Sequence, residues 1–280
     1  MAMKETALAD YAARREALGA ERIAAFWEAG KRLALRTGLV EGVARGGAVL
    51  FPHAFLSECG EQIAAAVYAA LQGCRERGKK RVLALGVVHA LNGRLLEARR
   101  RELGGEEVWG DGCRRVFRRE ELGREYSLDN FAFLWEKMGG EIELVSRYPN
   151  LVNGAPETLP GMEELQELAR EAVVVATADL CHQGVAYESE TALRLEEGGD
   201  FARRRVEENL GLLAGDDYLA YRKHAVSIKS DSKDVGQVLR YLLGPLRASV
   251  LDFKLVDTST MYVGDPRPSW VATALVGLNR

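Results

Sequence analysis

Short apolar runs alternate with helix-like patterns along much of the chain. Three runs, at 48–51, 82–88 and 172–177, are apolar almost throughout, which is typical of strands buried on both faces of a sheet. Between the first two, residues 60–76 place apolar side chains at helical spacing. A strand, a helix and a second strand in this order predict a parallel sheet, because parallel neighbours need a crossover connection.

Other helical patterns lie before and after this unit. Residues 4–37 predict one or two amphipathic helices, because their apolar positions recur at near-helical spacing. The Arg- and Glu-rich stretch 93–125 predicts an exposed connection with little core. The remaining predicted elements are helices at 127–138, 160–170, 188–198, 200–213, 216–224 and 234–246, and strands at 141–146, 249–257 and 270–278.

Together these elements predict an α/β fold: a mostly parallel central sheet sandwiched by helices, with additional β-strands at the C-terminus. Neither an internal repeat nor a linker interrupts the pattern. We therefore expect residues 1–280 to form a single domain, with residues 1–40 as a helical N-terminal segment packed on it.

Composition narrows the class of protein. The 280 residues are 47% hydrophobic and 28% charged, as in ordinary globular proteins. A net charge of −3 argues against nucleic-acid binding by phosphate neutralisation. Apolar runs are much shorter than the ~20 residues of a membrane span, and the N-terminal sequence lacks the apolar core of a signal peptide. We expect a soluble, cytoplasmic protein without a membrane partner.

The four histidines are the most informative residues. Three of them, His53, His89 and His182, come directly after the three apolar runs. Ligands of open α/β sheets bind at the carboxyl ends of the strands, where such residues converge. Neutral imidazole binds metals and also exchanges protons near neutral pH. A shared site is therefore predicted, whereas His224 is interpreted as structural.

Three residues near these histidines have more than one possible role. Asp179, three residues before His182, could orient an imidazole, join a metal shell or cap a helix. Cys59 and Cys181 could supply thiolates, although a free cysteine is commonly a small core residue. The sequence contains no close CxxC pair, P-loop, GxGxxG, HExxH or GxSxG motif.

Four segments around these residues resemble motifs of the Memo family. They are PHA at 52–54, LGVVH at 85–89, EYSLD at 125–129 and ATADLCHQG at 176–184. They are similar to the PHAG, LGPSH, EHSxE and SSDFxHxG motifs of that family, the last being the most specific match. Their order and spacing fit from about residue 45 to the C-terminus.

The resemblance implies a fold shared with class III extradiol dioxygenases, in which two histidines and a carboxylate hold ferrous iron. Memo proteins keep the histidines, place a cysteine at the third ligand position and have been linked to iron, copper and redox activity. By this resemblance His53 and His89 are the paired metal ligands, His182 is an acid or base beside them, and Asp179 is its neighbour.

The third ligand departs from the family pattern. The cysteine should fall within residues 228–232, where Ser230 is the closest positional match and Asp231 lies one residue further on. Asp231 would restore a set of two histidines and one carboxylate, which suits Fe(II). The glycine after PHA is replaced by Phe55, the histidine of EHS by Tyr126, and the N-terminal Gly-Trp-Tyr motif of the family is absent.

Three functional hypotheses follow. The first is a Memo-like protein that binds Fe(II), with zinc or copper as alternatives, and performs dioxygenase- or oxidase-type chemistry on a small molecule with O2. The second is a metal-dependent hydrolase with the same ligands, and the third is a non-catalytic binding or scaffold protein. Phe55, Tyr126 and Phe131 are candidates to line the pocket. The sequence leaves the substrate and the oligomeric state open.

Overall fold

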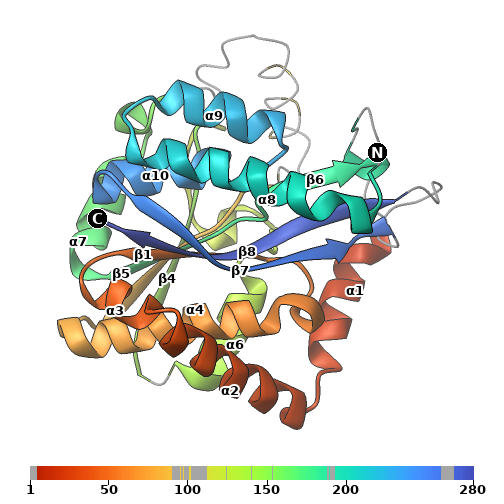
Figure 1. The fold of residues 1–280 in the computed structure, drawn as a ribbon. Helices are drawn as coiled ribbons and strands as arrows, with labels where there is room; N and C mark the ends of the chain where they lie inside the picture. The colour runs from red at the N-terminus through yellow and green to blue at the C-terminus, as the bar shows by residue number, and fades with distance from the viewer. Residues whose placement is uncertain are drawn as a thin grey trace.

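The computed structural model describes residues 5–89, 112–123, 125–139, 141–152, 154–187, 193–259 and 268–280, together with positions 95, 97, 101 and 189. In this part of the chain, one mixed sheet lies between two layers of helices (Figure 1). The predicted α/β fold is confirmed. None of the described helices combines the length and apolar character that crossing a bilayer requires.

The sheet has a parallel centre and antiparallel edges. Its strand order is β3-β4-β2-β5-β1-β8-β6, with β7 paired to β8. Parallel pairing joins β4 to β2, β2 to β5 and β5 to β1, and the other pairs are antiparallel. The strands are β1 (Ala48–Phe51), β2 (Arg81–Leu85), β3 (Arg115–Phe117), β4 (Glu143–Asn150), β5 (Val173–Thr177), β6 (Cys181–Gly184), β7 (Arg247–Asp257) and β8 (Ser269–Asn279).

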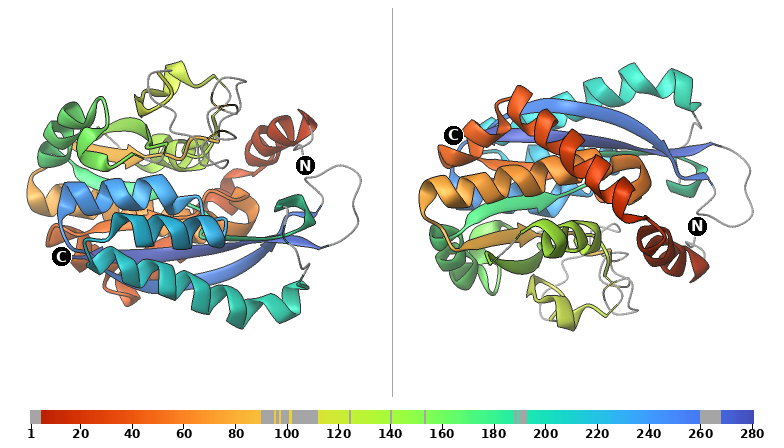
Figure 2. Two further views of the ribbon diagram at one scale, coloured as in Figure 1. Left: turned by 90° about the horizontal axis from the view of Figure 1, so that it is seen from above. Right: turned by 90° about the horizontal axis from the view of Figure 1, so that it is seen from below.

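Helices cover both faces of the sheet (Figure 2). One layer contains α2 (Ala20–Arg36), α3 (Leu39–Ala44), α4 (Leu56–Arg77) and α6 (Asp129–Met138). The other contains α7 (Met162–Glu171), α8 (Leu195–Gly211), α9 (Tyr218–Ser227) and α10 (Ser232–Leu243). The first helix, α1 (Glu5–Glu16), lies at one end of the molecule, where Tyr11 donates a hydrogen bond to the backbone oxygen of His53.

The central strands are buried on both faces, as their unbroken apolar sequences predict. Along β5, Val173 and Val175 enter the core beneath α4, whereas Val174 and Ala176 enter the core beneath α7–α10. The same alternation occurs along β1 and β2. Each of these strands therefore contributes to two hydrophobic cores, which holds its carboxyl end in a fixed place.

Several predicted elements differ in extent. The helix predicted at 60–76 starts earlier, at Leu56, and the strand predicted at 141–146 extends to Asn150. The predicted helices at 188–198 and 200–213 were wrong as two units, because α8 runs unbroken from Leu195 to Gly211. Gly198 is needed inside this helix, since a Cβ there would lie 2.5 Å from the Trp270 ring.

Two further predictions need correction. The stretch 93–125, predicted to be a connection, lies partly outside the described residues, but it contains the edge strand β3. His182 was expected directly after the strand that ends at Thr177. Instead the chain turns and forms β6, and His182 lies within it, opposite Val271 of β8. This pairing joins residues far apart in the sequence, which a local pattern does not indicate.

Candidate metal centre

The predicted site residues meet in one pocket near the carboxyl ends of β1, β2 and β5. His53 follows β1 by two residues, His89 follows β2 by four, and Asp179 follows β5 by two, while Asp231 immediately precedes α10. The pocket encloses about 360 Å³. Its lining includes Tyr11, His53, Phe55, His89, Tyr126, Asp179, His182, Tyr187, Lys229, Asp231 and Thr258.

His53 presents one defined nitrogen to this pocket. The Thr177 hydroxyl donates its proton to the backbone oxygen of Phe51 at 2.9 Å, so towards His53 it can only accept. Nδ1 of His53 lies 3.1 Å from that hydroxyl and is therefore the protonated nitrogen of the neutral ring. The backbone N–H of His53 also donates to Oδ1 of Asp179 at 3.2 Å. Nε2 is left facing the pocket.

His89 is oriented by the buried carboxylate of Glu125. Nδ1 of His89 donates to Oε1 of Glu125 at 2.8 Å, and the backbone N–H of His89 donates to Oε2 at 2.7 Å. Oε1 also accepts the backbone N–H groups of Tyr126 and Ser127. Burial raises the pKa of Glu125, but the His89 charge and these hydrogen bonds outweigh it and lower the pKa to about 2. A carboxylate bonded to Nδ1 is a common support for a metal-binding histidine, because it leaves Nε2 as the ligand atom.

His182 is oriented in a similar way, by a backbone carbonyl group. Its Nδ1 lies 2.5 Å from the carbonyl oxygen of Lys229, which can only accept, so Nδ1 carries the proton. Lys229 adopts a left-handed conformation at φ 54° after the last turn of α9, and this turns its carbonyl towards the imidazole. Nε2 of His182 therefore faces the pocket as well.

Asp231 stands where these nitrogens converge. Its backbone N–H donates to the Asp179 carbonyl at 3.0 Å, which ties the start of α10 to the end of β5. Among the described residues its buried Oδ2 makes no well-aligned hydrogen bond, and Nε2 of His53 faces it at 3.2 Å as an ion-pair partner. Burial raises the pKa of this carboxyl, but the charges of His182 and His53 outweigh that effect and lower it overall.

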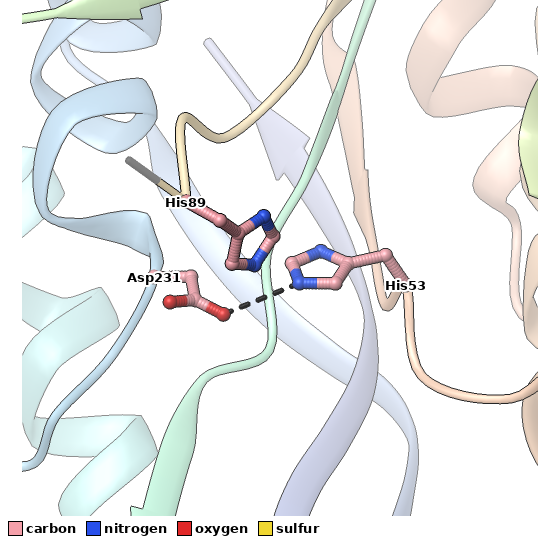
Figure 3. Close-up of side chains that lie close together, drawn as sticks. All are labelled: His53, His89 and Asp231. Carbon is pink, nitrogen blue, oxygen red and sulfur yellow. Dashed lines mark ion pairs between the residues drawn. The ribbon is translucent and has the colours of Figure 1, made fainter. Parts of the chain in front are cut away.

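The separation between the Asp231 carboxylate and His53 fits the edge of a coordination shell. Two ligands ~2.1 Å from one ion are about 3.0 Å apart in octahedral and about 3.4 Å apart in tetrahedral geometry. Oδ2 of Asp231 lies 3.2 Å from Nε2 of His53 and 3.6 Å from Nε2 of His182. His53, His89 and Asp231 each offer a ligand atom, and these atoms all lie within 4.8 Å of one another (Figure 3). This group could hold a metal ion.

Without a metal, a proton takes the place of the cation on His53. Burial lowers the pKa of His53, but Asp179 and Asp231 outweigh this effect and raise the pKa to about 9. Nε2 of His53 lies 3.8 Å from Oδ2 of Asp179 and 3.2 Å from Oδ2 of Asp231. Two carboxylates facing one buried imidazole thus attract positive charge, and metal binding would displace the proton.

All five predicted site residues therefore line the same pocket, although their individual roles stay predictions. Ser230 is turned away from it: its hydroxyl lies 2.8 Å from the hydroxyl of Ser232 and accepts the Ser232 N–H. Among the described residues, no cysteine joins a candidate metal group. Cys59 donates to the carbonyl oxygens of Ala54 and Phe55, just before α4, and Cys181 is buried in the core beneath α7–α10.

Three aromatic side chains form a wall beside the histidines. The Tyr126 ring stacks on the His89 ring, with centroids 4.5 Å apart and planes 12° apart. Tyr11 packs on both Phe55 and Tyr126, with centroids 4.7 and 5.1 Å away. Phe131 was expected here as well, but it stacks on Phe51 in the core instead.

Sequence reasoning missed the residues that orient the histidines. Glu125 lies in the EYSLD segment, and Thr177 ends an apolar run. A signal existed for Glu125, since it is an acidic residue next to a Ser-containing helix start. For Thr177 the signal was a hydroxyl that ends an otherwise apolar strand beside the His53 strand. His224 lies outside the pocket, 3.3 Å from Glu208, as its structural interpretation predicts.

Comparison with known proteins adds no family assignment. A scan against protein-family models finds no match, and a search of curated proteins finds none either. The resemblance to the Memo family therefore stays a prediction, and the candidate centre rests on the geometry of this chain.

Proposed function

We propose that this chain is a Memo-like, non-haem iron protein that carries out dioxygenase- or oxidase-type chemistry on a small organic molecule. One observation carries the proposal. Because their Nδ1 atoms are engaged by Thr177 and Glu125, His53 and His89 present Nε2 to the Asp231 carboxylate. The buried Oδ2 of that carboxylate makes no well-aligned hydrogen bond among the described residues.

The donor set supports Fe(II) over other metals. Two histidines and one carboxylate with open positions are the ligands of non-haem Fe(II) oxygenases. Zinc and copper also accept imidazole and remain the alternative ions. Bound iron would supply the one-electron chemistry that reactions with O2 require. The pocket of about 360 Å³ leaves room for a small molecule beside the three ligands.

The residues around the three ligands have separate tasks in this proposal. His182 is the group that holds or moves a proton, since its Nδ1 is fixed by the Lys229 carbonyl and its Nε2 faces the pocket. Asp179 positions His53 through the backbone N–H and keeps positive charge nearby. Tyr126 and Tyr11 cover one side of the pocket and limit the access of water.

The test is metal analysis of protein purified without a polyhistidine tag. We expect about one equivalent of iron per chain, and its loss in His53→Ala and in His89→Ala. His224→Ala is the matched control, because it removes the histidine that lies outside the pocket, and it should keep its iron. Iron content that survives both pocket substitutions would overturn the proposal.

Oxygen dependence separates the alternatives. Zinc in place of iron, with turnover under anaerobic conditions, would favour a metal-dependent hydrolase that uses the same ligands. Biological function that survives removal of His53, His89 and His182 together, in a folded protein, would favour a binding or scaffold protein.

A further inference from the structure

A second group of ligand atoms lies beside the proposed iron site. Asp179, His182 and Asp231 each offer one ligand atom, and these three atoms also lie within 4.8 Å of one another. The two groups share Asp231 and differ in every other member. One carboxylate therefore belongs to both groups, which are neighbours in the same pocket: Oδ2 of Asp179 in the second group lies 3.8 Å from Nε2 of His53 in the first.

In His182, as in His53 and His89, the proton is held on Nδ1 and Nε2 is available to bind a cation. The Lys229 carbonyl holds the proton on Nδ1, so the lone pair of the neutral ring is on Nε2. Nε2 lies 3.6 Å from Oδ2 of Asp231, longer than a hydrogen bond and close to the separation of two ligands on one ion. The ring is only 11% exposed, and the Tyr187 ring packs 4.6 Å away.

Asp179 completes this second group. Its side chain is 6% exposed, and Oδ1 accepts the His53 N–H while Oδ2 lies 3.8 Å from the His53 ring nitrogen. Oδ1 is therefore used by the backbone N–H of His53, and Oδ2 remains as the oxygen that can bind a cation.

We propose that Asp179, His182 and Asp231 form a second divalent-cation site, with Asp231 shared between the two ions. Carboxylate and imidazole ligands of this kind suit Zn²⁺ and similar borderline ions. Paired ions in proteins lie ~3.5–4 Å apart and repel each other. The second site is therefore weaker than the first, and it fills only when free metal is plentiful.

Filling this site has a consequence that rests on the proposed function. His182 is there the group that holds or moves a proton, and a cation on Nε2 occupies the lone pair that this task needs. Excess divalent metal therefore inhibits turnover while the iron site stays filled. The same pocket would thus respond to the concentration of free metal.

The experiment is a calorimetric titration of the metal-free full chain with Zn²⁺. We expect two equivalents per chain, the second at least about tenfold weaker because of repulsion between the ions. His182→Ala should lose the weaker equivalent and keep the tighter one. Asp179→Asn should do the same, and it is nearly isosteric, so the oxygen that accepts the His53 N–H is kept. His224→Ala should bind Zn²⁺ as the unchanged protein does.

The outcomes separate this inference from the proposed function. A single equivalent that His53→Ala removes and His182→Ala leaves unchanged would overturn the second site alone. Loss of the weaker equivalent in His224→Ala would also overturn it, because the ion would then sit near Glu208. An absence of Zn²⁺ binding to the unchanged chain would overturn both proposals. Circular dichroism of each variant establishes that it is folded.

Discussion

Replacing Glu125 by glutamine in the metal-free protein tests how the site is held together. The carboxylate accepts four hydrogen bonds, two of them from His89. Glutamine has a single acceptor oxygen, and its NH2 group would face an N–H donor at the position that it takes over. The substitution keeps the size of the side chain, so its effect reports charge and hydrogen bonding rather than packing.

The magnitude follows from the pKa of Glu125. Its fall from 4.5 to about 2 means that the folded state favours the ionised carboxyl. Each pKa unit is equivalent to about 1.4 kcal/mol, so the ionised form contributes about 3 kcal/mol of stability at pH 7. The stabilisation that comes from a lowered carboxyl pKa is fully present above about pH 4.5 and is lost as the pH falls towards 2. About 2 kcal/mol of it remains at pH 3.5.

Urea unfolding at pH 7 and at pH 3.5, followed by circular dichroism, measures this difference. Glutamine resembles the neutral carboxyl. The unchanged protein should therefore exceed Glu125→Gln in free energy of unfolding by about 3 kcal/mol at pH 7, and this gap should narrow by about 1 kcal/mol at pH 3.5. Glu120→Gln is the control: that side chain is exposed, and its effect should stay within about 0.5 kcal/mol. A gap below about 1 kcal/mol at pH 7, or one that does not narrow with acid, would refute the reasoning.

Two other substitutions test the preparation of His53 and the packing of the helical layer. Thr177→Val removes the acceptor of the His53 Nδ1 proton and should weaken metal binding by about 10- to 100-fold in a chelator competition, whereas Thr177→Ser should keep it. Equal affinity in the valine variant would contradict the assigned tautomer. Gly30→Ala places a Cβ 2.6 Å from the backbone nitrogen of Ala65 in α4 and should cost about 1–3 kcal/mol in urea unfolding. Gly19→Ala, where a Cβ meets nothing within 4 Å, serves as the comparison, and an equal cost at both positions would contradict the close approach of α2 and α4.

The parallel centre of the sheet was predictable because its sequence pattern is local. A strand buried on both faces must be apolar at successive positions, as Val173 to Ala176 are. The positions of His53 and His89 follow from the same pattern, since they lie two and four residues after such strands. By contrast β6 is short and depends on pairing with β8, whose residues lie about 90 positions later in the chain.

The identity of the proposed third ligand depends on the turn between α9 and α10. Ser230 and Asp231 are adjacent, and which of them faces the pocket follows from the left-handed conformation of Lys229 and the hydrogen bond from Asp231 to the Asp179 carbonyl. Neither feature has a sequence pattern of its own. Glu125 was similarly hidden, because most of its hydrogen bonds come from backbone N–H groups, which every residue carries.

The candidate centre brings together residues from two separate parts of the fold. His53 and His89 follow strands of the sheet, whereas Asp231 belongs to the junction of α9 and α10. An ion held by all three would have to lose a ligand before α10 could detach from the sheet. We therefore expect added metal to slow amide hydrogen exchange in α10 by a factor that grows with metal concentration above its dissociation constant. The local stability of the start of α10 would then report whether the centre holds a metal ion.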